Sequence, residues 1–251
     1  MDFGIKGKTA IVTGASSGLG KAIAEGFAAE GANVVLFARR AQLLEANARE
    51  LQEKYAAKVR VVAGDMRNKS DIGRLSAVAG EWGGPDILVI NTGRPPVPMR
   101  AILDESEDER WQAAYETQLW GAVLLVREIV PRLVERGWGR VIAVTSASVK
   151  QPMPHHGLST IFRAGVTGML KHLANEVGTK GVTVNTVCPG SIATASMGNY
   201  DMTERIRRLP VGRLGTPAEL ASAVLYFASQ QAGFITGASL QVDGGGVGSL
   251  Y

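Results

Sequence analysis

The glycine-rich stretch Thr13-Gly14-Ala15-Ser16-Ser17-Gly18-Leu19-Gly20 constrains what this chain can fold into more than any other feature. It follows the apolar run 9–12 and precedes a helical pattern over 21–29, so it joins a buried strand to the start of a helix. The first glycine permits a sharp turn, the second leaves room beside the backbone, and the third lets the helix pack closely on the strand. Because free N–H groups at a helix start favour an anion, the stretch predicts a phosphate-binding turn, with a plain strand-to-helix turn as the alternative.

The rest of the chain predicts an α/β protein with a Rossmann-type, doubly wound parallel sheet of about seven strands. Buried strands are expected at 33–38, 59–65, 86–90, 139–146, 182–187 and 237–243. Helical patterns separate them, and the 251 residues suit a single domain over 1–251. A composition of 45% apolar but only 6% aromatic residues fits strands buried on both faces under closely packed helices.

Composition also excludes several classes of protein. The net charge of +4 comes from scattered basic residues without interleaved aromatics, which argues against nucleic acid as a partner. The single cysteine, Cys188, allows neither an internal disulfide nor a CxxC metal pair. The apolar runs are shorter than a membrane span and no signal sequence precedes the first strand, so we expect a cytoplasmic protein without a membrane anchor.

The spacing Gly-x-x-x-Gly-x-Gly, with Thr13 in front, resembles the short-chain dehydrogenase/reductase family. Three further stretches support the resemblance: 91–93 in part, 189–194, and the C-terminal 237–245. The family usually has Asn-Asn-Ala-Gly where this chain has Ile90-Asn91-Thr92-Gly93. The resemblance spans nearly the full chain and is greatest to the 3-oxoacyl-carrier-protein reductase branch, which implies a nicotinamide cofactor and carbonyl or alcohol chemistry.

Arg39 and Arg40 decide which nicotinamide cofactor we expect. They end the second predicted strand, about twenty residues after the last glycine, where a carboxylate would bind the adenosine ribose of NAD(H). Two arginines favour the extra phosphate of NADP(H), unless they only flank a solvated helix start. Cofactor contacts are therefore expected from the turn and, by resemblance, from later loops: Gly14, Ser16, Ser17, Gly18, Leu19, Gly20, Arg39, Arg40, Asp65, Met66, Asn91, Gly93, Arg163, Pro189, Gly190, Ile192 and Thr194.

The catalytic residues depart from the family. Ser146 occupies the position of the family's substrate-binding serine, but Tyr-x-x-x-Lys is replaced by Ser159 and Arg163, and the family's helical asparagine by Gln118. A serine hydroxyl is a much weaker acid than a phenol. Arg163 can still hydrogen-bond the nicotinamide ribose, yet it stays protonated and cannot relay a proton.

A replacement proton donor is therefore expected on the turn that follows Ser146. Lys150, His155 and His156 are the candidates, and a histidine titrates nearest to neutral pH. The alternative is that Lys150 is a solvated loop residue and that the histidines serve packing or capping.

Three other segments bear on substrate and assembly. The proline-rich loop 94–100 places Arg94 toward substrate or solvent. The segment 195–209 carries Met197 and three arginines, and we expect it to close over an acidic substrate or an acyl chain borne on phosphopantetheine. Helix 108–136, bent or ended at Pro131, carries an apolar face that would bury poorly in a monomer: Leu119, Val123, Leu124, Val126 and Ile129. The family builds its dimer here, so we expect a homodimer or homotetramer, whose neighbouring subunit the tail 246–251 could reach.

The sequence thus favours an NADP(H)-dependent oxidoreductase acting on a small carbonyl or acyl-thioester substrate with a rebuilt proton donor. Two alternatives stay open. One is a nucleotide-binding protein without redox activity, serving as a sensor or as a partner in a hetero-oligomer. The other is non-redox chemistry at the altered site.

Overall fold

Over residues 2–195 and 201–250, which a computed structural model describes, the chain forms one parallel sheet of seven strands. Its order is β3-β2-β1-β4-β5-β6-β7, and the direction of winding reverses between β1 and β4. The strands are β1 (Thr9–Thr13), β2 (Asn33–Ala38), β3 (Val59–Ala63), β4 (Ile87–Asn91), β5 (Gly139–Val144), β6 (Val182–Pro189) and β7 (Ser239–Val242). The doubly wound fold predicted from sequence is confirmed, although β3, β5 and β7 are shorter than expected.

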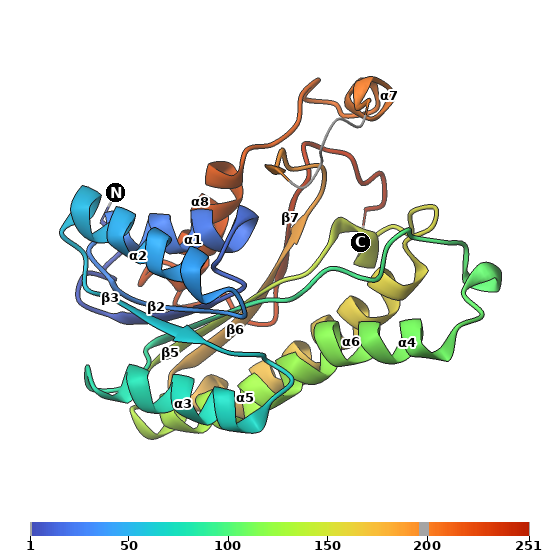
Figure 1. The fold of residues 1–251 in the computed structure, drawn as a ribbon. Helices are drawn as coiled ribbons and strands as arrows, with labels where there is room; N and C mark the ends of the chain where they lie inside the picture. The colour runs from blue at the N-terminus through green and yellow to red at the C-terminus, as the bar shows by residue number, and fades with distance from the viewer. Residues whose placement is uncertain (1, 196–200, 251) are drawn as a thin grey trace.

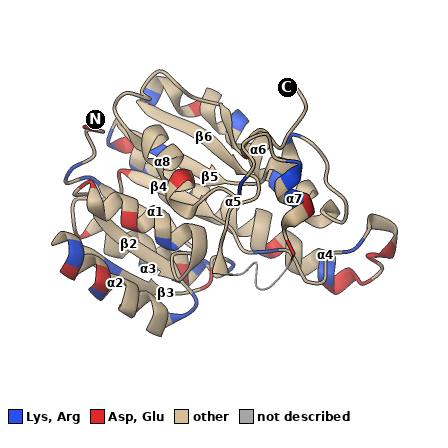
Figure 2. Ribbon diagram, turned by 90° about the horizontal axis from the view of Figure 1, so that it is seen from above, with Lys and Arg blue, Asp and Glu red and all other residues tan. Residues whose placement is uncertain are grey.

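Helices cover both faces of the sheet (Figure 1, and from above in Figure 2). One face carries α1 (Gly18–Ala29), α2 (Ala41–Tyr55) and α8 (Pro217–Ala228), and the other carries α3 (Lys69–Gly80), α5 (Gly121–Glu135) and α6 (Gly157–Val177). The shorter elements are α4 (Asp108–Ala114), the π-helical turn η2 (Tyr115–Trp120), α7 (Thr203–Arg207) and three 3₁₀ turns, η1 (Ile102–Asp104), η3 (Ala147–Val149) and η4 (Gly178–Lys180). None of the helices in the described ranges has both the length and the apolarity needed to cross a membrane.

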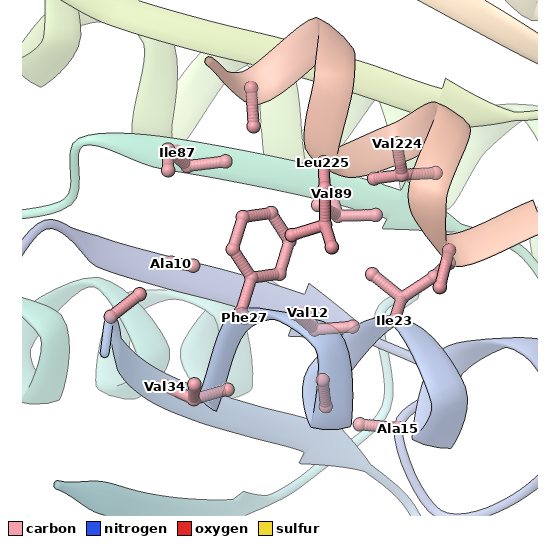
Figure 3. Close-up of a cluster of buried hydrophobic side chains, with 14 of the residues drawn as sticks. Ala10, Val12, Ala15, Ile23, Phe27, Val34, Ile87, Val89, Val224 and Leu225 are labelled. Atoms are coloured by element: carbon pink, nitrogen blue, oxygen red, sulfur yellow. The ribbon is translucent and has the colours of Figure 1, made fainter. Parts of the chain in front are cut away.

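Small residues let the layers approach closely. On the α1 and α8 face, Phe27 is fully buried over Val12 and Val89 of adjacent strands (Figure 3). A Cβ at Gly26 of α1 would lie 2.9 Å from the Leu225 side chain of α8. This close helix contact explains why a chain with so few aromatic residues still forms a dense core.

Helix 108–136 differs from its prediction in two respects. It is divided into α4, η2 and α5, and Pro131 lies inside α5, which continues to Glu135. The expected burial is also wrong, because Leu124 and Ile129 are buried within the single chain, in the apolar cluster that α5 shares with α3 and α6. Only part of the predicted face, including half-buried Val123, stays available to another subunit.

The tail does not extend away from the molecule over its described residues. The Gly248 N–H donates to Oε1 of Gln151 at 2.6 Å, and the Ser249 hydroxyl donates to the Lys150 carbonyl at 3.4 Å. Residues 248 and 249 therefore contact the loop after β5 of their own chain, and the expected contact with a neighbouring subunit stays a prediction. Tyr251 lies outside the described residues.

A buried ion pair anchors the loop after β4. Nε and Nη2 of Arg110 in α4 donate to the two carboxylate oxygens of Glu105 at 2.6 and 2.9 Å, and Nη2 also donates to the Pro98 carbonyl at 2.7 Å. The adjacent guanidinium holds the pKa of Glu105 below its usual range. The loop between Asn91 and this anchor keeps Val97 and Leu103 exposed.

We expect Ile129→Ala to lower the free energy of unfolding by about 3 kcal/mol, because it leaves a cavity in the core of one chain. The matched change Val123→Ala should cost less than about 1 kcal/mol. Urea denaturation measures both. Equal losses would mean that the α5 face is covered by a second subunit rather than by α3 and α6.

Candidate nucleotide and catalytic site

The glycine turn has the geometry that its spacing predicts. Gly14 and Gly18 have φ values of +63° and +56°, in the left-handed region that favours glycine. A Cβ at Gly20 would lie 2.3 Å from the Gly14 carbonyl oxygen, so only glycine permits this contact between helix and turn. A Cβ at Gly18 would meet no described atom within 4 Å, which leaves open space beside the backbone where a diphosphate would approach.

Two polar side chains hold this turn. The Thr13 hydroxyl accepts a hydrogen bond from the Asn91 N–H at 2.9 Å and donates to the Asn91 carbonyl at 3.1 Å, tying the end of β1 to the end of β4. Buried Asn47 of α2 donates to the Ala15 carbonyl at 3.0 Å. Sequence reasoning missed Asn47, although a polar residue on the apolar face of a helix was the available signal.

Arg40 turns toward the glycine stretch. Its Nη2 donates to the hydroxyls of Ser16 at 2.9 Å and Ser17 at 2.7 Å. Ser17 is the N-cap residue of α1, and its side chain makes no capping hydrogen bond within the described structure, so the helix start keeps N–H groups for another acceptor. Arg40 thus places its charge at the glycine turn, while Arg39 is exposed beside it.

Asp65 and Met66 follow β3 as expected, and each contacts a side chain or helix that the sequence did not indicate. Arg67 donates to the Asp65 carboxylate through Nε at 3.1 Å and Nη2 at 2.7 Å, which lowers the pKa of Asp65. Asp65 does not cap α3, because Asn68 does so by accepting from the Ser70 N–H. Met66 packs on α5, where a Cβ at Gly121 would lie 2.7 Å from its Cγ. Arg67 was not among the predicted residues.

Ser146 lies two residues after β5, at the start of η3, and its hydroxyl accepts two hydrogen bonds. Its Oγ accepts from the Ser148 N–H at 3.1 Å and from the Ser148 hydroxyl at 2.9 Å. The Ser146 proton therefore remains available for another acceptor. Buried Ser148 is a supporting residue that the sequence analysis did not single out.

The three predicted proton donors differ in their surroundings. Lys150 is half-buried at the end of η3, four residues after Ser146. His156 lies with Nδ1 2.8 Å from the Pro154 carbonyl, which occupies one ring nitrogen. His155 is exposed and has a φ of +61°. Lys150 is less exposed than His155, and its ammonium forms no hydrogen bond within the part of the chain that the structure describes.

Ser159 and Arg163 form a couple one helical turn apart on α6. Nη1 of Arg163 donates to the Ser159 hydroxyl, and Nη2 donates to the Gly93 carbonyl at 3.1 Å. The Nε atom is enclosed and has no partner among the residues that the structure describes. Burial, with a smaller effect of the nearby Arg94 charge, lowers the pKa of Arg163 to about 10, so the guanidinium is still protonated at neutral pH.

Gln118 lies in the π-helical turn and is fully buried. Neither Nε2 nor Oε1 has a hydrogen-bond partner within residues 2–195 and 201–250. Such turns in helices are frequent at functional sites, and a buried amide without partners calls for a water or ligand group.

The loop after β6 is fixed to the C-terminal segment. The Gly190 N–H donates to the Val242 carbonyl at 3.0 Å, and a Cβ at Gly190 would lie 2.6 Å from that of Asp243. Ile192 pairs with Gly215, which sets the course of the chain past Pro189 and on to Thr194. Cys188 is buried, and burial raises the pKa of its thiol, as expected for a core residue. Met197 lies outside the described residues.

The fold and the site define a Rossmann-type α/β protein. A family model described as Enoyl-(Acyl carrier protein) reductase matches residues 14–246. The 3-oxoacyl-[acyl-carrier-protein] reductase FabG of Vibrio cholerae is 37% identical over 247 residues, covering 96% of this chain and 98% of the relative. The chain therefore belongs to the short-chain dehydrogenase/reductase family of oxidoreductases.

Two solved structures match along the whole chain. L-sorbose reductase from Gluconobacter frateurii, complexed with NADPH and L-sorbose, is 35% identical with a TM-score of 0.91 and full coverage of both chains. A 7α-hydroxysteroid dehydrogenase complexed with NADH and 7-oxo glycochenodeoxycholic acid is 27% identical, also with a TM-score of 0.91, and covers 100% of this chain and 98% of its own. Relatives with this fold thus hold either nicotinamide cofactor.

We expect Gly20→Ala to lower mainly the stability of the fold and Gly18→Ala to lower mainly the binding of NADPH. Gly20→Ala should lower the free energy of unfolding by about 3 kcal/mol, because its Cβ overlaps the Gly14 carbonyl. Gly18→Ala should cost only about 1 kcal/mol for its left-handed backbone, yet abolish NADPH binding by filling the open space. Denaturation and nucleotide fluorescence separate the two effects. Unimpaired NADPH binding by Gly18→Ala would contradict the assignment.

Proposed function

We propose that this protein is an NADP(H)-dependent oxidoreductase that transfers hydride to or from a carbonyl or alcohol substrate, with a proton donor other than tyrosine. The observation that carries the proposal is the glycine turn at the N-terminus of α1, with open space at Gly18 and the Arg40 guanidinium beside it. The family and its NADPH-bound structural relative support the same chemistry.

The residues present fit a nicotinamide nucleotide. The turn from Gly14 to Gly20, including Ser16, Ser17 and Leu19, would hold the diphosphate at free N–H groups of α1, and Arg39 and Arg40 would hold the 2′-phosphate. The remaining contacts would follow the strand ends, with Asp65 and Met66 at adenine, Asn91, Gly93 and Arg163 at ribose, and Pro189, Gly190, Ile192 and Thr194 at the carboxamide. When bound, NADPH supplies the hydride.

In this proposal, Ser146 donates its free hydroxyl proton as a hydrogen bond to the substrate carbonyl oxygen and thereby orients the carbonyl. The Ser159 hydroxyl, which accepts from Arg163, keeps its own proton for the same oxygen. The substrate oxygen would need one proton on reduction, and the Lys150 ammonium would deliver it. The buried Gln118 amide would hold a water molecule near the helix turn.

The substrate is proposed to be a small carbonyl compound or an acyl thioester, because the relatives include 3-oxoacyl-[acyl-carrier-protein] reductases. A homodimer or homotetramer is proposed as the assembly. Its support is apolar surface at the open edge of the sheet, where β7 is the last strand, Leu240 on β7 is exposed and Phe234 just before it is fully exposed.

A second candidate function is nucleotide binding without hydride transfer. The replacement of the phenol and the amine by Ser159 and Arg163 favours it, because the strongest proton donor of the family is missing. Saturable NADPH binding without turnover on any β-ketoacyl thioester, diketone or keto acid would support this second function.

We predict that restoring the family's pair raises the rate. The double variant Ser159→Tyr with Arg163→Lys should increase kcat about 100-fold, because a phenol beside an amine is a better general acid than a serine. Following NADPH oxidation by absorbance over the same substrate panel measures this.

The matched control is Ser159→Phe with Arg163→Lys, which adds the ring without the hydroxyl and should give no gain. Lys150→Met should cost the parent enzyme about tenfold or more and the restored variant much less. A restored variant no faster than its phenylalanine control would contradict the placement of Ser159 at the reacting carbonyl.

Cofactor choice is predicted to depend on the two arginines after β2. Arg40→Ala and Arg39→Ala should each raise KM for NADPH about tenfold, the effect of one lost charge-assisted contact, while KM for NADH changes less than about twofold. Steady-state kinetics with both cofactors measures this. An equal rise for NADH would show that the arginines serve the turn and not the 2′-phosphate.

A further inference from the structure

Arg163 is a partly desolvated cation that no carboxylate neutralises within the described structure. Its two hydrogen-bond acceptors, the Ser159 hydroxyl and the Gly93 carbonyl, are both uncharged. A guanidinium has five N–H donors, and these contacts use two of them. Burying such a charge without an anion is unfavourable, so an anion that pairs with the Arg163 guanidinium would be stabilised there.

The surroundings add positive charge. Arg94 follows directly on Gly93, and its charge contributes to the lowered pKa of Arg163. Lys150 is half-buried on the neighbouring loop after β5.

Three acidic residues near the carboxyl ends of the strands, Asp65, Glu105 and Asp243, have other partners. Glu105 is paired with Arg110, and Asp65 with Arg67. Asp243 accepts from the backbone N–H groups of Gly245 and Val247. No described carboxylate forms an ion pair with Arg163, so a ligand or solvent ions would supply its counter-charge.

We infer that the carbonyl substrate carries an anionic group, a carboxylate or a phosphate ester, which pairs with the Arg163 guanidinium. The inference rests on the proposed function and specifies its substrate class. A planar guanidinium matches both anions through paired N–H groups, which an ammonium at this position would not do.

In its predicted position, the nucleotide would not supply an anionic partner for the Arg163 guanidinium. The ribose that Arg163 would contact is uncharged, and the diphosphate is assigned to the glycine turn at α1. A bound cofactor would also displace water from the site, which strengthens the pairing between Arg163 and an anion on the substrate.

The test uses the full chain saturated with NADPH and two matched pairs of substrates. Acetoacetate is compared with acetoacetamide, and dihydroxyacetone phosphate with dihydroxyacetone. The anionic member of at least one pair should have a kcat/KM about tenfold or more higher, as one charge-assisted hydrogen bond provides. The pair that shows the preference identifies carboxylate or phosphate as the anion.

Arg163→Gln should abolish the preference, and Arg163→Lys, which keeps the charge, should retain part of it. Circular dichroism establishes that both variants fold. If Arg163→Gln does not fold, a binding experiment with the parent protein replaces this variant. Malonate and malonamide are compared as competing ligands, with NADPH fluorescence as the readout. Malonate should bind about tenfold more tightly.

The possible failures are distinguishable. Turnover of neutral and anionic members at equal kcat/KM overturns the inference and leaves the proposed function intact. An absence of turnover on every substrate overturns the proposed function, and malonate competition then still reports whether an anion site exists. If malonate competes no better than malonamide, the inference is wrong.

Discussion

The contact between the first turn of α1 and the ends of β1 and β4 is the constraint on which the rest of the structure depends. A side chain at Gly20 would overlap the Gly14 carbonyl, and the Asn91 amide lies against the same two glycines. Thr13 closes the arrangement by exchanging two hydrogen bonds with the backbone of Asn91. These contacts lie where the winding of the sheet reverses, so the point that fixes the fold is also the point where an open α/β sheet binds its ligand.

In the proposed site, Ser159 and Arg163 take the positions at which the family resemblance predicts a tyrosine and a lysine. Ser146 keeps a proton to donate, and Ser159 with Arg163 forms a hydroxyl–guanidinium couple that positions groups but transfers protons poorly. The replacement of an amine by a guanidinium also changes recognition, because a planar cation in a partly desolvated site favours a planar anion. In our proposal, reduced proton transfer and increased anion binding both follow from the same two residues, Ser159 and Arg163.

The sequence predicted the sheet, the geometry of the glycine turn and the strand-end positions of most candidate residues, because strand periodicity and glycine spacing are local signals. It did not predict that α3 and α6 bury Leu124 and Ile129, since that depends on packing between distant segments. It also missed Asn47, Arg67 and Ser148, whose roles are to hold other site groups in place. Such supporting contacts join residues without a shared motif, so pattern reading does not find them.

Calorimetric titration of the purified chain with NADPH and with NADH tests the central claim most directly. The account predicts saturable binding of one NADPH per chain, with weaker binding of NADH because Arg39 and Arg40 gain nothing from a free 2′-hydroxyl. Absence of binding heat with both nucleotides over a range of temperatures would contradict the assignment of the glycine turn, and only the architecture would stand.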